Sequence, residues 1–216
     1  MDAVTHPHWP LFDLEVRTPR LALRYVDDPL ATELATLAAA GIHDPAFMPF
    51  SVPWTDAPSP ALEREAFRYW WRCRAETAPE RWQLNLAVII DGVVVGATNL
   101  GSREFAVTRT FGTGSWLGQA HQGRGIGTEL RQATLHLGFA GFGAEFATTA
   151  AFVDNLSSLG VTRRLGYAPN GTSVEARRGT PSELLHFRLS RAGWERIRRD
   201  DIALHGVQPC REILGL

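Results

Sequence analysis

Three glycines, Gly123, Gly125 and Gly127, lie between a segment typical of a strand and a segment typical of a helix. Glycine adopts positive φ and lets a ligand approach the backbone closely, so successive amides can point into one concavity. At the positive end of the helix that follows, such amides form an anion site. The cluster therefore predicts a phosphate-binding loop, although a flexible strand-to-helix turn also fits glycines taken alone.

This glycine cluster does not match the common nucleotide-binding fingerprints. The dinucleotide pattern Gly-x-Gly-x-x-Gly fails from either starting glycine, because Thr128 and Leu130 occupy the third glycine position. A P-loop is excluded because no Gly-Lys-Ser/Thr follows. A nucleotide-binding module that uses the loop for ATP or NAD stays an alternative, with both fingerprints against it.

The order of strands and helices predicts one mixed sheet. Residues 20–25 alternate polar and apolar side chains, as a half-buried strand does. The runs 84–90 and 93–100 are joined by Asp91-Gly92, which is typical of a tight hairpin. Further strands are expected over 110–117, 146–152 and 184–189, and helices over 29–40, 61–77, 128–140, 155–165 and 190–198. A meander followed by β-α-β crossovers predicts an α/β (α+β) fold, a mostly antiparallel sheet with helices on both faces.

Capping residues and prolines indicate where the helices begin and where the chain is irregular. We expect Asp28 to cap the first long helix, with Pro29 at its first position, and Ser190 to cap the last one. Five prolines between residues 42 and 60 predict a long surface loop. Its large apolar side chains either cover a cleft or seal the core: Phe47, Met48, Phe50 and Trp54.

Length and composition exclude several classes of protein. The 216 residues suit a single domain over 1–216, with 190–216 as a C-terminal extension. A net charge of -1 gives no basic surplus for nucleic acid, and no apolar run has the length of a membrane span, so a cytoplasmic protein is expected. Cys73 and Cys210 form no metal or disulfide pattern and the histidines lack metal spacing, so no metal is expected.

Four short motifs follow one another between residues 18 and 190. They are Gln122-x-x-Gly125-x-Gly127, the preceding strand Gly114-Ser115-Trp116-Leu117-Gly118, the later Asn155-x-x-Ser158-x-x-Val161-x-x-Arg164-x-Gly166-Tyr167, and the opening Thr18-Pro19-Arg20-Leu21-Ala22-Leu23-Arg24. Together they resemble the GNAT superfamily of N-acetyltransferases, in its RimJ/RimL-like branch, which acts on protein α-amines and other amines. The pattern is also similar to an actinobacterial-type subgroup for which a longer acyl-CoA is one expected donor.

The resemblance implies a V-shaped splay between 110–117 and 146–152, the fourth and fifth predicted strands. The pantetheine arm of coenzyme A would insert there like an added strand, and the glycine loop would hold the pyrophosphate. Arg124 would be a mobile cation near the phosphates or a solvated loop residue. The implied coenzyme A contacts are Trp116, Leu117, Gly118, Gln122, Gly123, Arg124, Gly125, Ile126, Gly127, Thr128, Asn155 and Ser158.

Acyl transfer to an amine passes through a tetrahedral oxyanion, which a backbone amide near Trp116 or Leu117 would stabilise. The resemblance implies that Ser158 contacts the thioester sulfur and that Asn155 contacts pantetheine. The same two residues also fit a cap at a helix start, and both roles are compatible.

A protonated amine acceptor must lose a proton before attack, and the sequence offers no clear base. Glu175 lies in Glu-x-x-x-Gly, loosely like a downstream glutamate of the RimL type, but two residues closer to the signature serine. Glu104 is a second candidate, at the end of a predicted strand. For both, a solvated carboxylate is the plainer interpretation. Tyr167 is expected in the core and His121 at the surface.

The donor and the acceptor are only partly indicated. The pair Arg177 and Arg178 could recognise a terminal carboxylate, so succinyl-CoA competes with acetyl-CoA as donor, although two solvated loop cations also fit. A protein N-terminus, a lysine or a small molecule could supply the amine, and a homodimer is one option. An acyl-CoA-binding sensor without turnover is the alternative to an enzyme.

Overall fold

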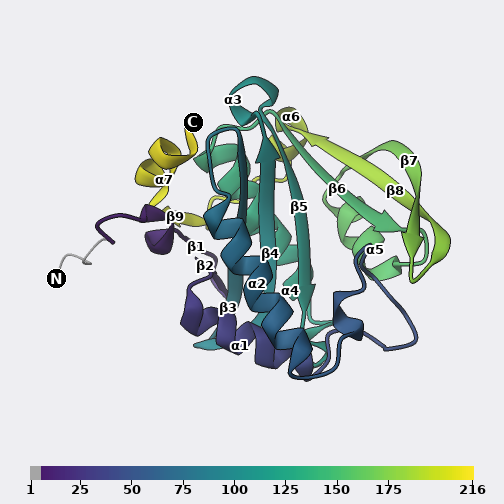
Figure 1. The fold of residues 1–216 in the computed structure, drawn as a ribbon. Helices are drawn as coiled ribbons and strands as arrows, with labels where there is room; N and C mark the ends of the chain where they lie inside the picture. The colour runs from purple at the N-terminus through teal and green to yellow at the C-terminus, as the bar shows by residue number, and fades with distance from the viewer. Residues whose placement is uncertain (1–5) are drawn as a thin grey trace.

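The computed structural model describes residues 6–216, which contain a nine-stranded sheet (Figure 1). The strand order is β7-β8-β6-β5-β4-β3-β2-β1-β9. All neighbours are antiparallel except β5 and β6, which are parallel. The strands are β1 (Glu15–Arg17), β2 (Ala22–Tyr25), β3 (Arg81–Ile90), β4 (Val93–Arg103), β5 (Thr110–Leu117), β6 (Phe146–Phe152), β7 (Ala168–Arg177), β8 (Thr180–Ser190) and β9 (Ala203–His205). This topology confirms the predicted fold class.

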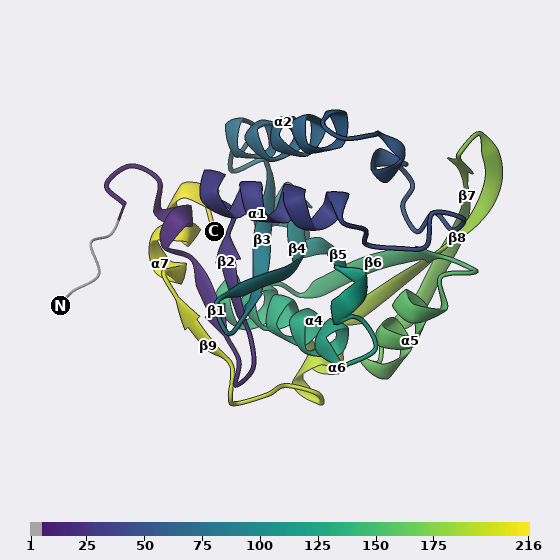
Figure 2. The same cartoon turned by 90° about the horizontal axis from the view of Figure 1, so that it is seen from below.

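Helices cover both faces of this sheet (Figure 2). One face carries α1 and α2, and the opposite face carries α4, α5 and α6. The α-helices are α1 (Asp28–Ala39), α2 (Ala61–Ala75), α3 (Phe105–Thr108), α4 (Ile126–His136), α5 (Leu156–Arg164), α6 (Arg191–Glu195) and α7 (Val207–Leu214). A π-helical turn, Leu137–Gly141, continues α4.

Two apolar clusters hold these layers together. Under α4, Leu130 and Leu137 pack with strand residues such as Phe111 and Leu86 in the larger cluster. On the other face, Leu34 of α1 packs with residues of α2, β3 and β4. Burial of about 25 cal/mol per Å² of apolar surface is the main force that fixes both helical layers on the sheet.

The parallel pair β5 and β6 separates after a short ladder. Its register has three residue pairs, from Thr110 with Phe146 to Gly112 with Thr148. Beyond Gly112, β5 pairs with β4 alone, and beyond Thr148, β6 pairs with β8 alone. The two strands diverge visibly in Figure 1. The splay predicted between these strands is therefore present.

Several predicted boundaries were wrong. Asp27, not Asp28, caps α1, and its side chain accepts a hydrogen bond from the Leu30 amide at 2.8 Å. Ser190 caps α6 as predicted, but α6 ends at Glu195. The strands β1, β7 and β9 and the helices α3 and α7 were not predicted. In the C-terminal segment 190–216, β9 extends the sheet by pairing with β1.

Candidate active site

The glycine loop joins β5 to α4 with the backbone geometry of an anion site. Gly123 and Gly125 have φ values of +73° and +77°, and Gly125 is the N-cap of α4 without a capping side chain. The amides of Thr128 and Glu129 bond to the Gly125 carbonyl oxygen. Among the described residues, the amides of 123–127 have no backbone acceptor. They are therefore available for a phosphate at the positive end of the helix.

Gln122 fixes this loop rather than pointing into it. Its Nε2 donates hydrogen bonds to the carbonyl oxygens of Ile42 and Leu117, both at 2.8 Å. The first lies after α1 and the second at the end of β5, so one side chain joins three segments. The first residue of the Gln-x-x-Gly-x-Gly motif therefore holds the loop backbone in place.

A buried carboxylate lies beneath the same loop. Glu129 is 5% exposed and accepts hydrogen bonds from Thr18 Oγ1 at 2.6 Å and from Arg20 Nε at 2.5 Å, with Arg199 Nη1 3.9 Å away. Arg20 also donates to the Arg124 carbonyl oxygen at 3.4 Å. The opening motif of the sequence therefore supports the loop, a role that motif comparison alone did not show. The Arg124 side chain forms no ion pair within residues 6–216.

Asn155 and Ser158 lie at the start of α5, directly after β6. The Asn155 Oδ1 accepts a hydrogen bond from the Ser158 amide at 3.1 Å, so Asn155 is a helix cap. Both residues are half-buried. The Ser158 hydroxyl has no hydrogen-bond partner among the described residues. The cap holds that hydroxyl near the β6 arm of the splay and leaves it free for a ligand.

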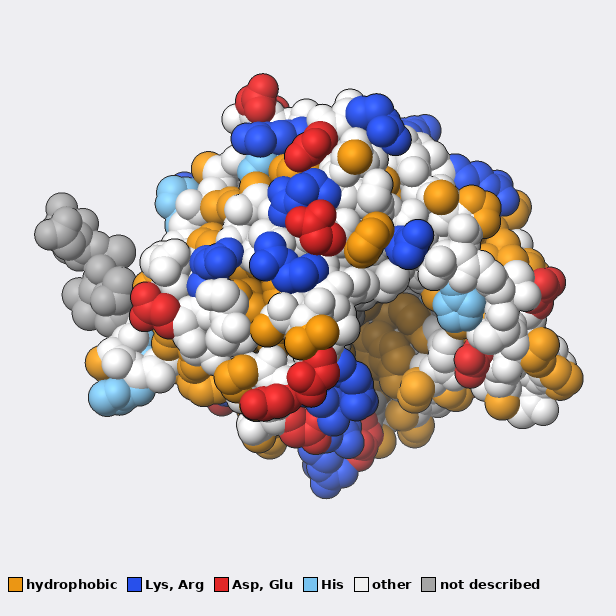
Figure 3. Space-filling view, turned by 90° about the horizontal axis from the view of Figure 1, so that it is seen from above, with side chains coloured by type: hydrophobic (Ala, Val, Ile, Leu, Met, Phe, Trp, Pro, Cys, Tyr) orange, Lys and Arg blue, Asp and Glu red, His pale blue; other side chains and the backbone are white. Residues whose placement is uncertain are grey.

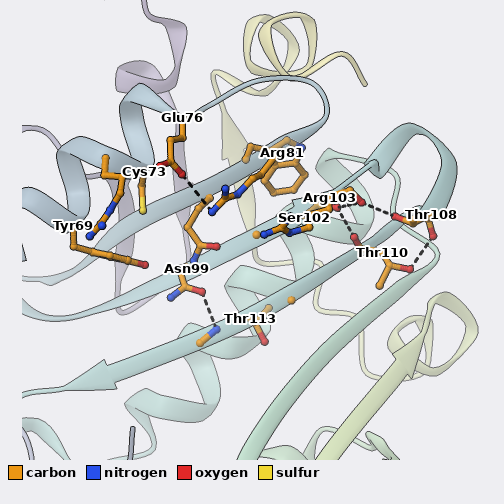
Figure 4. Close-up of a pocket in the computed structure, with 16 residues that line it drawn as sticks. Tyr69, Cys73, Glu76, Arg81, Asn99, Ser102, Arg103, Thr108, Thr110 and Thr113 are labelled. Atoms are coloured by element: carbon orange, nitrogen blue, oxygen red, sulfur yellow. Dashed lines mark hydrogen bonds and ion pairs between the residues drawn. The ribbon is translucent and has the colours of Figure 1, made fainter. Parts of the chain in front are cut away.

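A groove of about 1170 Å³ lies on the α2 face of the sheet and reaches the point where β5 and β6 diverge. Figure 4 shows Tyr69 and Cys73 of α2 and its C-cap Glu76 on one wall, with Asn99 of β4 facing them. The lining also includes Gly112, Thr113 and Gly114 of β5. In the space-filling view of Figure 3, the surface is hollowed beside a group of acidic and basic side chains. An acceptor in this groove would reach the splay from the α2 side.

A polar chain that the sequence did not suggest connects β7 and β8. The Ser173 hydroxyl lies 2.8 Å from His186 Nε2 and donates to Glu175 Oε1 at 3.4 Å. His186 pairs with Ala150, which lies on the diverging arm of β6. Glu175 is therefore linked through Ser173 to His186, a residue of β8 that pairs with the diverging arm of β6. Ser173 and Glu175 are two residues apart and so share one face of a strand, and this spacing could have indicated that they are neighbours. The strand β7 itself was not predicted, so the spacing was not recognised.

The other singled-out residues have plainer surroundings. Glu104 is exposed, follows β4 and has φ of +49°, and its side chain makes no hydrogen bond among the described residues. His121 ends the short turn after β5, half-buried. Tyr167 is 6% exposed, and burial raises the pKa of its hydroxyl. The expectation that Tyr167 lies in the core is confirmed.

Arg177 and Arg178 are already paired with carboxylates. Arg177 donates to both oxygens of Asp154 at 2.8 Å, and Arg178 donates to Asp56 Oδ2 at 2.8 Å and Oδ1 at 2.5 Å. These hydrogen bonds lower the pKa of both aspartates. Arg178 also donates to the Pro45 carbonyl oxygen at 3.0 Å. The two guanidinium groups tie the proline-rich loop to the β7–β8 hairpin and are not the free pair that the sequence suggested.

The structure also bears on metals and membranes. Within residues 6–216, no group of three His, Cys, Asp or Glu side chains is placed to hold a metal ion. In that same part of the chain, no helix combines the length and the apolar character that crossing a membrane requires. Cys73 and Cys210 are free thiols.

Comparison with known proteins agrees with this geometry. The model of the acetyltransferase (GNAT) domain matches residues 20–168. RimL, a ribosomal alpha-N-protein acetyltransferase solved with coenzyme A, has 17% identity and a TM-score of 0.67 over 80% of this chain and 95% of its own. An acetyltransferase structure from T. thermophilus has 17% identity and a TM-score of 0.67, covering 85% of this chain and 93% of that one.

A third structure extends the range of acceptors found with this fold. It is a chimera of the spermidine N-acetyltransferase SpeG from Vibrio cholerae, with 15% identity and a TM-score of 0.64 over 82% of this chain and 98% of that one. At such identities the structures share the fold. The family model, which matches most of the chain, carries the assignment: this chain belongs to the GNAT family of acetyltransferases, as its motifs indicated.

Proposed function

We propose that this protein transfers an acyl group from a coenzyme A thioester to a primary amine by direct attack in a ternary complex. The observation that carries the proposal is the position of the glycine loop at the mouth of the β5–β6 splay. The loop offers free amides to a pyrophosphate, and the unpaired edge of β5 offers backbone groups to the pantetheine amides. One extended ligand, coenzyme A, can therefore bind both the loop amides and the open edge of β5.

The contacts of the donor follow from this placement. Backbone groups of Trp116, Leu117 and Gly118 would bind pantetheine, and the amides of 123–127 would bind the pyrophosphate. The amide of Thr128, which was also expected there, already donates to the Gly125 carbonyl oxygen. The cation of Arg124 would lie near the phosphates. From Thr113 to Leu117, β5 spans about 13 Å at 3.3 Å per residue, which leaves room for an extended arm between the loop and the point of divergence.

The chemistry needs an oxyanion donor, an acid for the leaving group and a base. The amine nitrogen attacks the thioester carbon, the C–N bond forms, and an amide near Trp116 or Leu117 stabilises the oxyanion. Collapse breaks the C–S bond, and the Ser158 hydroxyl stabilises the departing thiolate. The amine proton passes through His186 and Ser173 to Glu175, or through water. Direct attack requires no covalent enzyme intermediate.

The groove favours an acceptor other than a polyamine. Of the residues that line it, Glu76 is the one carboxylate, and it lies 3.3 Å from Arg81. Arg72 and Arg103 add two further cations. A polycation would be repelled here, whereas the α-amine of an extended peptide fits an open groove. A peptide N-terminus is therefore the acceptor we propose first, ahead of lysine and small amines.

The acyl group is acetyl in the simplest form of this proposal. A succinyl donor is the second candidate, and Arg131, which is buried beneath the splay, supports it. A cytoplasmic location and a homodimer stay predictions.

Calorimetry with coenzyme A and a thiol-release assay with acetyl-CoA test the proposal. The acceptors are a peptide with a free N-terminus, the same peptide N-acetylated and carrying one lysine, and spermidine. We expect coenzyme A binding and thiol release with the free N-terminus. Tight binding with no release from any amine would instead establish the acyl-CoA sensor, and binding of ATP or NAD without coenzyme A would establish a nucleotide module.

A further inference from the structure

A positive charge is buried directly beneath the splay. Arg131 of α4 is 5% exposed. Its Nη1 donates to Thr149 Oγ1 at 3.0 Å and to Thr113 Oγ1 at 3.2 Å, and its Nη2 donates to Ser115 Oγ at 3.3 Å. Two of these hydroxyls belong to β5 and one to β6. The guanidinium therefore spans the two strands where their ladder has ended.

No carboxylate neutralises this charge among the residues that the structure describes. The partners of Arg131 are three hydroxyl groups, and its Nε is buried without a hydrogen-bond partner. The Tyr167 hydroxyl lies beside Arg131 and Thr113, and it too is buried without a hydrogen bond of regular geometry. A buried charge without a counter-charge is costly, and buried polar groups without partners are rare. An anion supplied by a ligand would satisfy the charge and both unpartnered groups.

The position of Arg131 matches the acyl end of the donor. Thr113 and Thr149 are the first residues of β5 and β6 beyond the last residue pair, so the guanidinium lies at the closed end of the splay. The phosphate loop is at the opposite, open end, five helical residues away, or about 8 Å along α4. The acceptor groove opens on the α2 face, whereas Arg131 lies on the α4 face. An acyl chain can thus extend away from the attacking amine and toward Arg131.

We propose that Arg131, with the Tyr167 hydroxyl, binds the terminal carboxylate of a dicarboxylic acyl-CoA and sets the selectivity of the enzyme for such a donor. The inference rests on the proposed function of the same cleft. It assigns carboxylate recognition to Arg131 in place of Arg177 and Arg178, whose charges Asp154 and Asp56 already neutralise. The role is one of specificity, so no bond is formed or broken at Arg131.

The test compares three donors that differ at the end of the acyl chain. Succinyl-CoA carries the carboxylate, butyryl-CoA has the same number of acyl carbons without the charge, and acetyl-CoA is the short reference. Kd is measured by calorimetry on the full chain without an acceptor. For the wild type we expect succinyl-CoA to bind roughly ten- to a hundredfold more tightly than butyryl-CoA, as for a hydrogen bond to a charged group.

Three variants distinguish carboxylate recognition by Arg131 from a purely structural role between β5 and β6. Arg131→Leu should abolish the preference for succinyl-CoA over butyryl-CoA, and Arg131→Lys should retain part of it. Tyr167→Phe, which removes one oxygen atom from a packed ring, should reduce the preference while keeping the fold. Arg177→Leu is the matched control, since it removes a guanidinium that an aspartate already neutralises, and should leave the preference unchanged.

The outcomes distinguish this inference from the proposed function. A wild type that binds all three donors with equal Kd would overturn the inference and leave coenzyme A-dependent transfer standing. An equal loss of affinity for all three donors in the Arg131 and Tyr167 variants would mean that Arg131 only stabilises the two strands. That result would also overturn the inference. No binding of any coenzyme A thioester by the wild type would end both proposals.

Discussion

Replacing Gly125 by valine tests the phosphate loop most directly. The residue has φ of +77°, a conformation that costs a residue with a Cβ about 1–2 kcal/mol. A Cβ there would have Arg20 Nη2 as its nearest neighbour, at 3.8 Å, so space is available in the free protein. The side chain of valine would instead occupy the concavity where we place the pyrophosphate.

The expected loss of affinity follows from the contacts that the branched side chain blocks. Hydrogen bonds to a charged group contribute roughly 1.5–3 kcal/mol each, so losing one or two phosphate contacts weakens coenzyme A binding by well over tenfold. The strain itself should lower Tm by about 2–8 °C, since 1 kcal/mol corresponds to about 2–4 °C for a domain of this size. Calorimetry gives Kd, and a thermal scan confirms that the variant is folded.

Gly92→Val is the matched control for backbone strain. Gly92 has φ of +78° and lies in the β3–β4 hairpin, where a Cβ would meet no atom within 4 Å. Both variants should therefore lose similar stability, but only Gly125→Val should lose coenzyme A affinity. A folded Gly125→Val protein with the affinity of the wild type would refute the phosphate-loop assignment.

Three further variants and one control variant probe the chemistry and the core. Ser158→Ala should lower kcat more than it raises the donor KM, because a bond to the departing sulfur strengthens as charge develops, whereas a pure KM effect in steady-state kinetics would assign Ser158 to binding or capping. Glu175→Gln should flatten the alkaline rise of the pH–rate profile, and an unchanged profile would remove Glu175 as the base. Gly138→Ala should lower the free energy of unfolding, measured by urea denaturation, by about 1–3 kcal/mol, because the new Cβ would lie 2.2 Å from Phe111 Cζ. Gly160→Ala is the control: it lies within α5, where a Cβ would meet no atom within 4 Å, and it should be neutral or stabilising.

The elements with strong local signals were predictable. Asp91 and Gly92 have φ of +49° and +78°, so the dipeptide forms the turn that its residue types favour. The glycine loop was also recognisable, because positive φ at Gly123 and Gly125 is a backbone requirement that sequence displays. The splay was expected only through the family resemblance, since no local pattern shows where a ladder ends.

The missed features depend on tertiary surroundings. Near its start, after Ala168, the strand β7 contains Pro169, Asn170 and Gly171, which are typical of a turn, and it forms an exposed edge of the sheet. Residues 27 and 28 are both aspartates, so either could cap a helix. Which of them caps α1 depends on where the first helical turn begins, and the sequence does not show this. Arg131 looks like an ordinary polar residue on a helix, and its burial becomes visible only when both strands above it are in place.

The short β5–β6 ladder has a mechanical consequence. The sheet consists of two parts, β7-β8-β6 and β5-β4-β3-β2-β1-β9. Within the described chain, the only ladder that joins them is the β5–β6 ladder of three residue pairs. An extended ligand that forms hydrogen bonds along the diverging parts of β5 and β6 would lengthen this ladder and make the connection between the two parts of the sheet more rigid. At a free ligand concentration of a hundred times Kd, binding adds about 2.7 kcal/mol to the stability of the folded state. The angle between the two parts of the sheet would then depend on the bound ligand as well as on the three residue pairs of the ladder.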